Sequence, residues 1–239
     1  PETLRKTIDE ALARLQTDII DLYYLHRYDK LNDVPIEDSV GEMARMVEAG
    51  KIRAIGLSEV SAETLRKAHA VHPIAAVQSE YSLWSRNAEI AVVDACAELG
   101  AAFVAFSPVA RGFLTDVELD PANFAEKDIR RGMPRFKAPH FEKNAELLPA
   151  FRQLAKAADC TPAQLALAWV LHKAPHMHVI PGTTSLNHLE ENLAAGAITL
   201  SAEIVSNVET LINQNTVSGP RYPAGTQVEI DTEEFAGAS

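Results

Sequence analysis

Several residues that can bind a polar ligand or move a proton follow short apolar segments of this 239-residue chain. His26 ends the apolar run of "DLYYLHRYD" and opens a group of titratable side chains. Gln78 follows "AAV", and a buried amide must find partners, either a neighbouring backbone group or a carboxamide on a ligand. Ser58, Ser107 and Thr183 hold the same place after other apolar segments. One histidine alone would be typical of a structural role, but five polar segment ends together predict a shared site.

Two turns have the composition of anion sites. In "FSPVARGFLT" (106–115) a Ser-Pro turn precedes Arg111 and Gly112, which can offer backbone N–H groups and a charge to phosphate. An ordinary strand-to-loop turn is the alternative there. Residues 182–185 form a turn of small residues before a helix, where backbone donors and the helix dipole favour an anion.

The helix after that turn carries a polar face. His188, Glu191 and Asn192 lie about one turn apart and can contact a base or a ribose, and a capped surface helix is the alternative. The basic run "KDIRRGMPRFK" (127–137) is either a solvated loop or a lid that closes over phosphates. His176 and His178 have no third ligand at metal spacing, so we expect no metal site.

Alternating strands and helices must position these residues. The apolar runs predict strands over 19–25, 52–58, 74–79, 102–107 and 178–182. Helical periodicity and capping residues predict helices over 1–15, 37–49, from Ser61 onward, and over 87–99, 144–158, 162–173, 186–195 and 201–214. A long polar stretch separates Ser107 from residue 144, and residues 217–239 form a tail with little periodicity.

The strands are continuously apolar, which is typical of parallel strands buried on both faces. Such βα units fit either a doubly wound sheet or a (β/α)8 barrel, and polar residues at the carboxyl ends of the strands favour the barrel. Five strands cannot close a barrel of that kind. The predicted architecture is therefore open or incomplete.

The composition excludes several classes of function. A net charge of −11 argues against general binding to nucleic acid or anionic membranes, and no apolar run is long enough to span a membrane. The GxGxxG and GxSxG patterns are absent. Cys96 and Cys160 lie far apart and suit buried thiols in a reducing compartment, so we expect a cytoplasmic protein.

Five segments together resemble the aldo-keto reductases, in the branch that contains auxin-induced-protein-like and pyridoxal-reductase-like members. They are "DLYYLHRYD", "GKIRAIGLSEVSAETLRKA", "VQSEYSLWSR", "AFSPVARGFLT" and "IPGTTSLNHLEENLAA", and the resemblance extends through "GPRYP". It implies a (β/α)8 barrel of TIM type, of which this α/β chain supplies five parallel βα units that correspond to strands 4–8. The resemblance also implies one domain over 1–239, truncated at its N-terminal side.

The resemblance implies a role for each matched residue. His26 matches the catalytic histidine, which orients and polarises the substrate carbonyl. Ser58 and Gln78 match the pair that binds the nicotinamide carboxamide. The other cofactor-binding residues that it implies are Phe106, Ser107, Val109, Arg111, Gly112, Gly182, Thr183, Thr184, Glu191 and Asn192, to which the helix face adds His188. We expect Tyr28, Trp84 and Phe113 to form an apolar pocket for a carbonyl substrate.

Three departures from the family pattern affect these expectations. Glu59 stands where asparagine is usual, and residues 185–188 lack the cation that a 2′-phosphate prefers. NADP(H) is therefore the expected cofactor with NAD(H) still open, and Arg135 is our candidate for the missing cation. The family's tyrosine, lysine and aspartate belong to its first three βα units and have no match here. Tyr23 and Tyr24 lie inside the first strand and are expected to be core residues.

The resulting hypothesis is an NADPH-dependent reductase of aldehydes and ketones, impaired in this chain because three catalytic residues are missing. One alternative is a cofactor-binding regulatory protein, similar to channel β-subunits, without significant turnover. Another is a doubly wound protein that binds a different phosphate ligand. The oligomeric state is left open.

Overall fold

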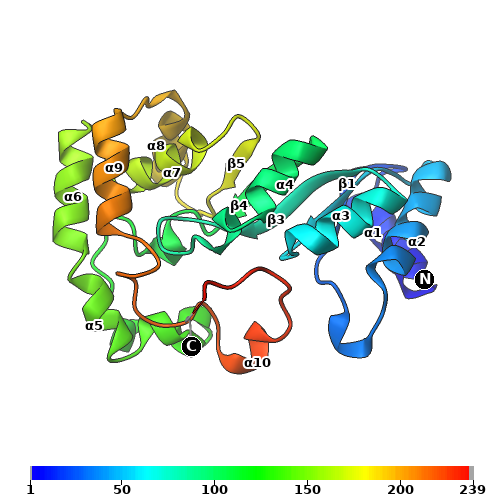
Figure 1. The fold of residues 1–239 in the computed structure, drawn as a ribbon, viewed down its shortest axis with the longest axis horizontal. Coiled ribbons are helices and arrows are strands. Elements are labelled where there is room, and N and C mark those ends of the chain that lie inside the picture. The colour runs from blue at the N-terminus through cyan, green and yellow to red at the C-terminus, as the bar shows by residue number, and fades with distance from the viewer. Residues whose placement is uncertain (1, 237–239) are drawn as a thin grey trace. The chain divides into compact units, whose positions relative to one another are not determined.

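The computed structural model describes residues 2–236 as one open sheet with helices between its strands (Figure 1). The strands are β1 Ile20–Leu25, β2 Ile52–Ser58, β3 Ile74–Glu80, β4 Ala102–Phe106 and β5 Met177–Ile180. The helices are α1 Glu2–Leu15, α2 Ile36–Glu48, α3 Ala62–Val71, α4 Val92–Leu99, α5 His140–Ala145, α6 Leu148–Ala157, α7 Pro162–His172, α8 Leu186–Ala194, α9 Ala202–Leu211 and α10 Ala224–Gln227.

The five strands are parallel and lie in chain order, β1-β2-β3-β4-β5. Within the described residues the sheet does not close, so β1 and β5 are its edges. The predicted α/β class with five parallel βα units is confirmed. The expectation of strands buried on both faces is wrong for β1, none of whose residues is fully buried. As an edge strand it pairs only with β2, so less of its surface is covered.

Two predicted helices differ from the structure. The predicted helix 144–158 overlaps the last two residues of α5, and α6 starts only at Leu148. Pro149 lies in the first turn of α6, where its missing N–H costs nothing. The segment 87–99 begins with a 3-10 turn, Asn87–Glu89, and α4 itself starts at Val92. The tail after residue 217 is packed, since Arg221, Tyr222 and Ile230 are buried.

The chain folds into two compact units. The first contains residues 2–79, 89–103 and 228–233. Its α2 packs against α3, and α3 against α4 (Figure 1). The core is formed by β2, β3 and the inner faces of these helices, with Met43, Ile55, Leu57, Leu65 and Val77 fully buried. Cys96 of α4 is buried, and that burial raises the pKa of its thiol to about 12.

Residues 228–233 complete the first unit at the N-terminus of α3. Ser61 is the N-cap of α3, and its Oγ accepts a hydrogen bond from the backbone N–H of Thr64. The carboxylate of Asp231 accepts from the backbone N–H and Oγ of Ser61 at 3.2 and 3.0 Å, and from Oγ1 of Thr64 at 2.6 Å. Lys30 donates to the carbonyl of Ile230. A distant part of the sequence therefore satisfies the first donors of α3.

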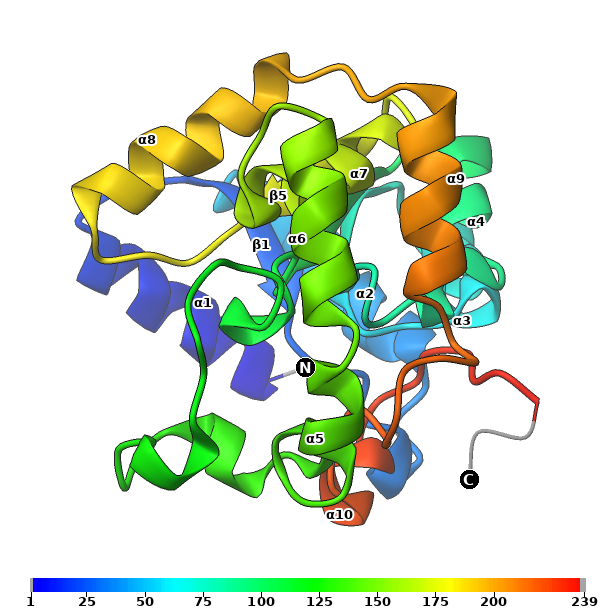
Figure 2. The ribbon, with the colours of Figure 1, turned by 90° about the vertical axis from the view of Figure 1, so that its left-hand side faces the viewer.

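The second unit contains residues 80–88, 104–227 and 234–236. Its α7 is apolar on nearly all sides and is its most buried helix, in contact with α6, α8 and β5. The helices α6 and α9 run side by side (Figures 1 and 2). Cys160, expected to be buried, is only partly covered because it lies in the connection between α6 and α7.

Candidate active site

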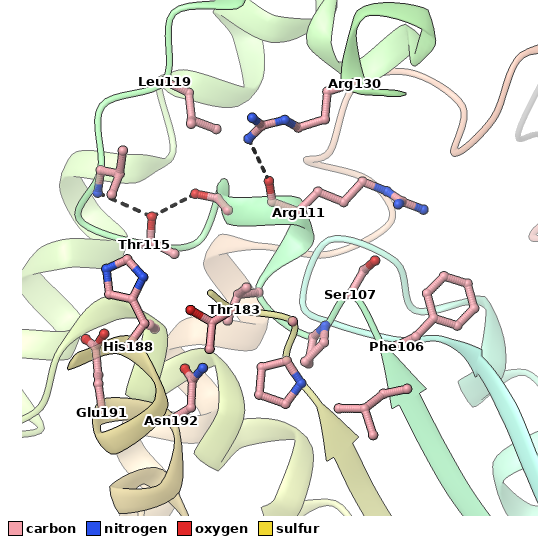
Figure 3. Close-up of a pocket in the computed structure, with 18 of the residues that line it drawn as sticks. Phe106, Ser107, Arg111, Thr115, Leu119, Arg130, Thr183, His188, Glu191 and Asn192 are labelled. Carbon is pink, nitrogen blue, oxygen red and sulfur yellow. Dashed lines mark hydrogen bonds between the residues drawn. The ribbon is translucent and has the colours of Figure 1, made fainter. Parts of the chain in front are cut away.

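A cavity of about 710 Å³ in the second unit gathers most of the predicted cofactor-binding residues. Its walls come from the loop after β4, the turn after β5 and one face of α8 (Figure 3). We call it the loop pocket. The predicted residues that line it are Phe106, Ser107, Val109, Arg111, Gly112, Gly182, Thr183, His188, Glu191 and Asn192. Thr184 follows Thr183 in the turn, is exposed, and is not among the lining residues.

The loop after β4 has an unusual backbone. Ser107, Ala110 and Arg111 have φ angles of 52°, 51° and 58°, which side-chain-bearing residues rarely adopt, and Gly112 has φ 89°. The N–H groups of Ala110 and Gly112 are held by the carbonyls of Ser107 and Val109, at 2.9 and 3.1 Å. Left-handed residues of this kind cost about 1 kcal/mol each and collect at ligand sites. Loops of this kind turn successive backbone dipoles toward a bound anion.

Arg111 does not present its charge to this pocket. Its guanidinium pairs with Glu80 at 3.1 Å and contacts the hydroxyl of Tyr222 at 3.3 Å. Figure 3 shows the side chain directed away from His188 and Glu191. Burial would raise the pKa of Glu80, but Arg221, Arg111 and Arg135 outweigh it and hold that pKa at about 2.

Arg130 lines the pocket together with Asp128, with which it forms an ion pair. Its Nη1 donates to the carbonyl of Arg111 at 3.1 Å (Figure 3), and its Nη2 contacts Asp128 at 2.7 Å. The hydrogen bond from Arg130 lowers the pKa of Asp128, and the guanidinium also lies 4.1 Å from the ring centre of Phe124. Arg130 belongs to the basic run 127–137, which the sequence analysis identified as a candidate phosphate-binding segment. Within that run, Arg135 was the residue predicted to supply the cation.

Arg135 lies elsewhere in the second unit. It donates to the carbonyls of Trp84 and Gly219 and to Oγ of Ser85, the last two at 2.9 Å. Burial lowers the pKa of its guanidinium to about 10. Arg135 lines a separate cavity of about 570 Å³ that shares no residue with the loop pocket. Its guanidinium donates there to two backbone carbonyls and to one side-chain hydroxyl, and its expected role as a phosphate-binding cation stays a prediction.

The turn after β5 leads into α8, whose face forms the third wall of the pocket. Ser185 is the N-cap of α8, and Oγ1 of Thr183 accepts from its N–H at 3.0 Å. His188, Glu191 and Asn192 then lie together on the face of α8 that borders the pocket (Figure 3). Glu191 accepts a 2.5 Å hydrogen bond from Oγ1 of Thr161, the N-cap of α7.

The first unit contains the other predicted residues. His26 follows β1 and is exposed, and its carbonyl accepts from Nη1 of Arg27 at 2.9 Å. Ser58 and Gln78 are partners in the register of β2 and β3. The buried Ser58 accepts from Arg27 at 3.4 Å. Glu59 is buried with φ 53°, and its N–H donates to the carbonyl of Gln78 at 3.0 Å.

The predicted substrate residues are divided between the units. Tyr28 is half-buried in the first. Trp84 and Phe113 belong to the second, stacked with ring centres 4.1 Å apart and only 5% and 2% exposed. Their rings form a packed aromatic cluster with Phe136 and Phe141. Neither lines the loop pocket.

Two further features are absent from residues 2–236. No group of three or more His, Cys, Asp or Glu side chains there is arranged to hold a metal ion. No helix in that range has the length and apolar character needed to cross a membrane.

Comparisons with known proteins identify the relatives of this chain. The model of the aldo/keto reductase family matches residues 1–213. The aldo-keto reductase yakc of Schizosaccharomyces pombe, whose name includes NADP(+), is 43% identical over 97% of this chain and 69% of its own length. Probable aldo-keto reductase 1 of Glycine max is 44% identical over 94% of this chain and 64% of its own length. The chain thus spans about two thirds of these relatives.

The chain is also similar to solved structures of oxidoreductases. A glycerol dehydrogenase from Gluconobacter oxydans superposes with a TM-score of 0.80 at 27% identity, covering 92% of this chain and 66% of that one. A thermostable aldo-keto reductase crystallised with the inhibitor epalrestat gives a TM-score of 0.69 at 28% identity, over 88% of this chain and 66% of its own. The five strands therefore correspond to part of a barrel fold of TIM type.

Proposed function

The chain belongs to the aldo/keto reductase family, and from this we propose that it acts in NADP(H)-dependent reduction of aldehydes or ketones to alcohols. The observation that carries the proposal is the loop pocket, in which residues from three separate segments meet. The conversion of a carbonyl to an alcohol is what the family name implies. The small-molecule carbonyl and the NADP(H) preference are parts of the proposal.

The donor set of the loop pocket fits the phosphates and adenosine of a nicotinamide dinucleotide. Arg130 would supply a cation, Thr183 a hydroxyl, and the loop after β4 the backbone N–H groups of Val109 and Arg111, since those of Ala110 and Gly112 are bonded to carbonyls within the loop. Glu191 and Asn192 offer an acceptor and an amide for the edge of a base. We propose Arg130 for the cation because it lines the loop pocket, whereas Arg135 lines the separate cavity.

The residues of the first unit are proposed to act at the reacting end. Ser58 and Gln78 would hydrogen-bond a nicotinamide carboxamide, and His26 would donate a hydrogen bond to the carbonyl oxygen and orient it. The bound cofactor supplies the hydride that reduces the carbonyl carbon. A proton must also reach the oxygen, and general acid catalysis of this kind contributes roughly 10²- to 10⁴-fold. The proposal assigns no proton donor to these 239 residues.

The test is a titration of this chain with NADPH and with NADH, followed by fluorescence, and then an assay of aldehyde reduction. We expect saturable binding, tighter for NADPH, that is abolished by excess NADP⁺. No binding of either nucleotide would overturn the proposal. Binding without reduction of any carbonyl would favour the alternative, a cofactor-binding protein without significant turnover.

A further inference from the structure

The separate cavity of about 570 Å³ in the second unit has a lining suited to an anion. Its walls come from residues 84–87, from Arg135 and His140, and from the tail, residues 214–235, and we call it the tail pocket. Among the described residues that line it, three are arginines and only Glu234 is a carboxylate. Both oxygens of Glu234 already accept hydrogen bonds, from Asn87 and Gln227. The ionised side chains of the lining therefore carry an excess of positive charge.

Arg135 supplies a cation of this lining that no carboxylate neutralises. Its Nε and Nη1 donate to two backbone carbonyls and to Oγ of Ser85, all of them neutral acceptors. Within residues 2–236 it forms no ion pair, and its Nη2 has no acceptor. Arg111 differs, because it pairs with Glu80 at 3.1 Å. Since a charge shielded from water is costly without an opposite charge, the guanidinium of Arg135 favours an anion in the pocket.

The indole of Trp84 adds a second donor to the same lining. Trp84 is 5% exposed, and its buried Nε1 has no hydrogen-bond partner in the described part of the chain. A buried donor without an acceptor is destabilising and rare. Trp169 has the ordinary arrangement, with its Nε1 donating to Glu209 at 3.1 Å. The guanidinium carbon of Arg135 lies 5.5 Å from the centre of the Trp84 ring, so the two donors are within reach of one carboxylate.

We propose that the tail pocket binds a small organic carboxylate, whose oxygens accept from Arg135 and from the indole N–H of Trp84. The pocket is far larger than chloride or phosphate requires, and its volume is within the range of small-molecule sites, about 300–1,000 Å³. Val217, Pro220 and Phe235 of the lining offer apolar contacts to the body of such a molecule. The inference does not depend on the proposed function, because the tail pocket shares no residue with the loop pocket.

The experiment titrates the ¹⁵N-labelled chain with 3-phenylpropionate and with its uncharged amide, and follows the two indole N–H signals by NMR. Trp84→Phe identifies the Trp84 signal, and Trp169 is the internal control. We expect the acid to shift the Trp84 signal saturably, and the amide to bind roughly 10-fold more weakly or worse, because it lacks the charge. Sodium chloride and NADPH should not displace the acid. A Trp84 signal that the acid leaves unchanged overturns the inference, and Nε1 then has another partner, such as a water in the adjoining cavity of about 10 Å³.

Two pairs of variants test the site. Arg135→Gln should weaken the acid roughly 10-fold or more, whereas Arg131→Gln, at an exposed position outside the lining, should not. Gln214→Glu adds a negative charge to the wall at an exposed residue, so it tests the pocket even if Arg135→Gln fails to fold. It should weaken the acid several-fold more than Gln153→Glu, on the exposed surface of α6. Equal binding of acid and amide, equal effects of Gln214→Glu and Gln153→Glu, or displacement by chloride or NADPH would each overturn the inference.

Discussion

The hydroxyl of Thr161 donates a 2.5 Å hydrogen bond to Oε1 of Glu191, so a residue of the loop pocket is joined to the first turn of α7. The side chain of Gln164 adds a second contact, to the carbonyl of Glu191 at 3.2 Å. Thr161 and Gln164 also form the capping box of α7, a helix buried along nearly its whole length. One wall of the pocket is thereby supported by the core of the second unit.

This relationship predicts different effects at two neighbouring pocket residues. Glu191→Ala should lower the free energy of unfolding by about 1 kcal/mol, the net value of one hydrogen bond, and should also weaken NADPH binding. Asn192→Ala should weaken binding with unchanged stability. Urea unfolding and NADPH titration of both variants measure the two effects. Equal stability of the two variants would show that the Thr161 contact contributes nothing.

Arg130 provides the second prediction. Arg130→Gln should raise the dissociation constant for NADPH by roughly 10-fold or more, since a charge-assisted hydrogen bond contributes about 1.5–3 kcal/mol. Arg131→Gln is the control, because Arg131 is exposed and does not line the pocket. Binding measured at increasing salt should show a weaker salt dependence for Arg130→Gln than for the control. If Arg135→Gln weakens binding and Arg130→Gln does not, the assignment of the cation is wrong.

The third prediction concerns two glycines. Gly56→Ala should destabilise the protein by about 1–3 kcal/mol, because the new methyl group would overlap the ring of Tyr24. Gly41→Ala, in α2, has no atom within 4 Å of the new Cβ and should stabilise the protein by about 0.5–1 kcal/mol. Thermal or denaturant unfolding checks the opposite signs. A neutral Gly56→Ala would mean that the ring moves at no cost.

The buried cluster around Glu80 gives a pH-dependent prediction. The pKa of Glu80 is about 2 in the folded protein, below the ordinary value of 4.5. Its stabilisation is therefore complete above about pH 4.5 and is lost as the pH falls from there toward 2. Unfolding free energies of the wild type should decrease over that window more steeply than those of Glu80→Gln.

Glu80→Gln should also lower the free energy of unfolding at neutral pH. Glu80→Gln leaves Arg111, Arg221 and Arg135 without their shared carboxylate, and breaking a buried pair costs about 3–5 kcal/mol. Glu98→Gln removes an exposed ion pair with Arg66 and should cost at most about 1 kcal/mol. Similar losses in both variants would contradict a special role for the buried cluster.

Local sequence signals located the strands well. The apolar run 52–58 between Lys51 and Glu59 is the strand found in the structure, because a short apolar run bounded by polar residues has few other stable outcomes. Pro149 was the overlooked signal that separates α5 from α6. The partial exposure of β1 could not be predicted, since burial depends on which strands pair and not on the strand's own residues.

The positions of some loop-pocket residues could likewise be predicted from the sequence, and those of others could not. Ser107 directly follows β4, and Gly182 and Thr183 lie in the short turn after β5, so the ends of these strands determine where they lie. Arg130 and Arg135 belong to a long loop, where position depends on contacts with distant segments. Arg135 is held by Gly219 and Trp84, and Arg130 by Asp128 and the backbone of Arg111. No periodicity in the loop distinguishes two arginines five residues apart.

The contacts of Asp231 with Ser61 and Thr64 can form only late in the synthesis of the chain. These partners are 170 and 167 residues apart in the chain. On a ribosome that adds about 5–20 residues per second, α3 is made roughly 10–30 seconds before the carboxylate that completes its N-terminus. The first unit therefore reaches its final state only after nearly all of the second unit has been synthesised. Until then, the Ser61 N–H and the hydroxyls of Ser61 and Thr64 lack the carboxylate that accepts their hydrogen bonds in the folded protein.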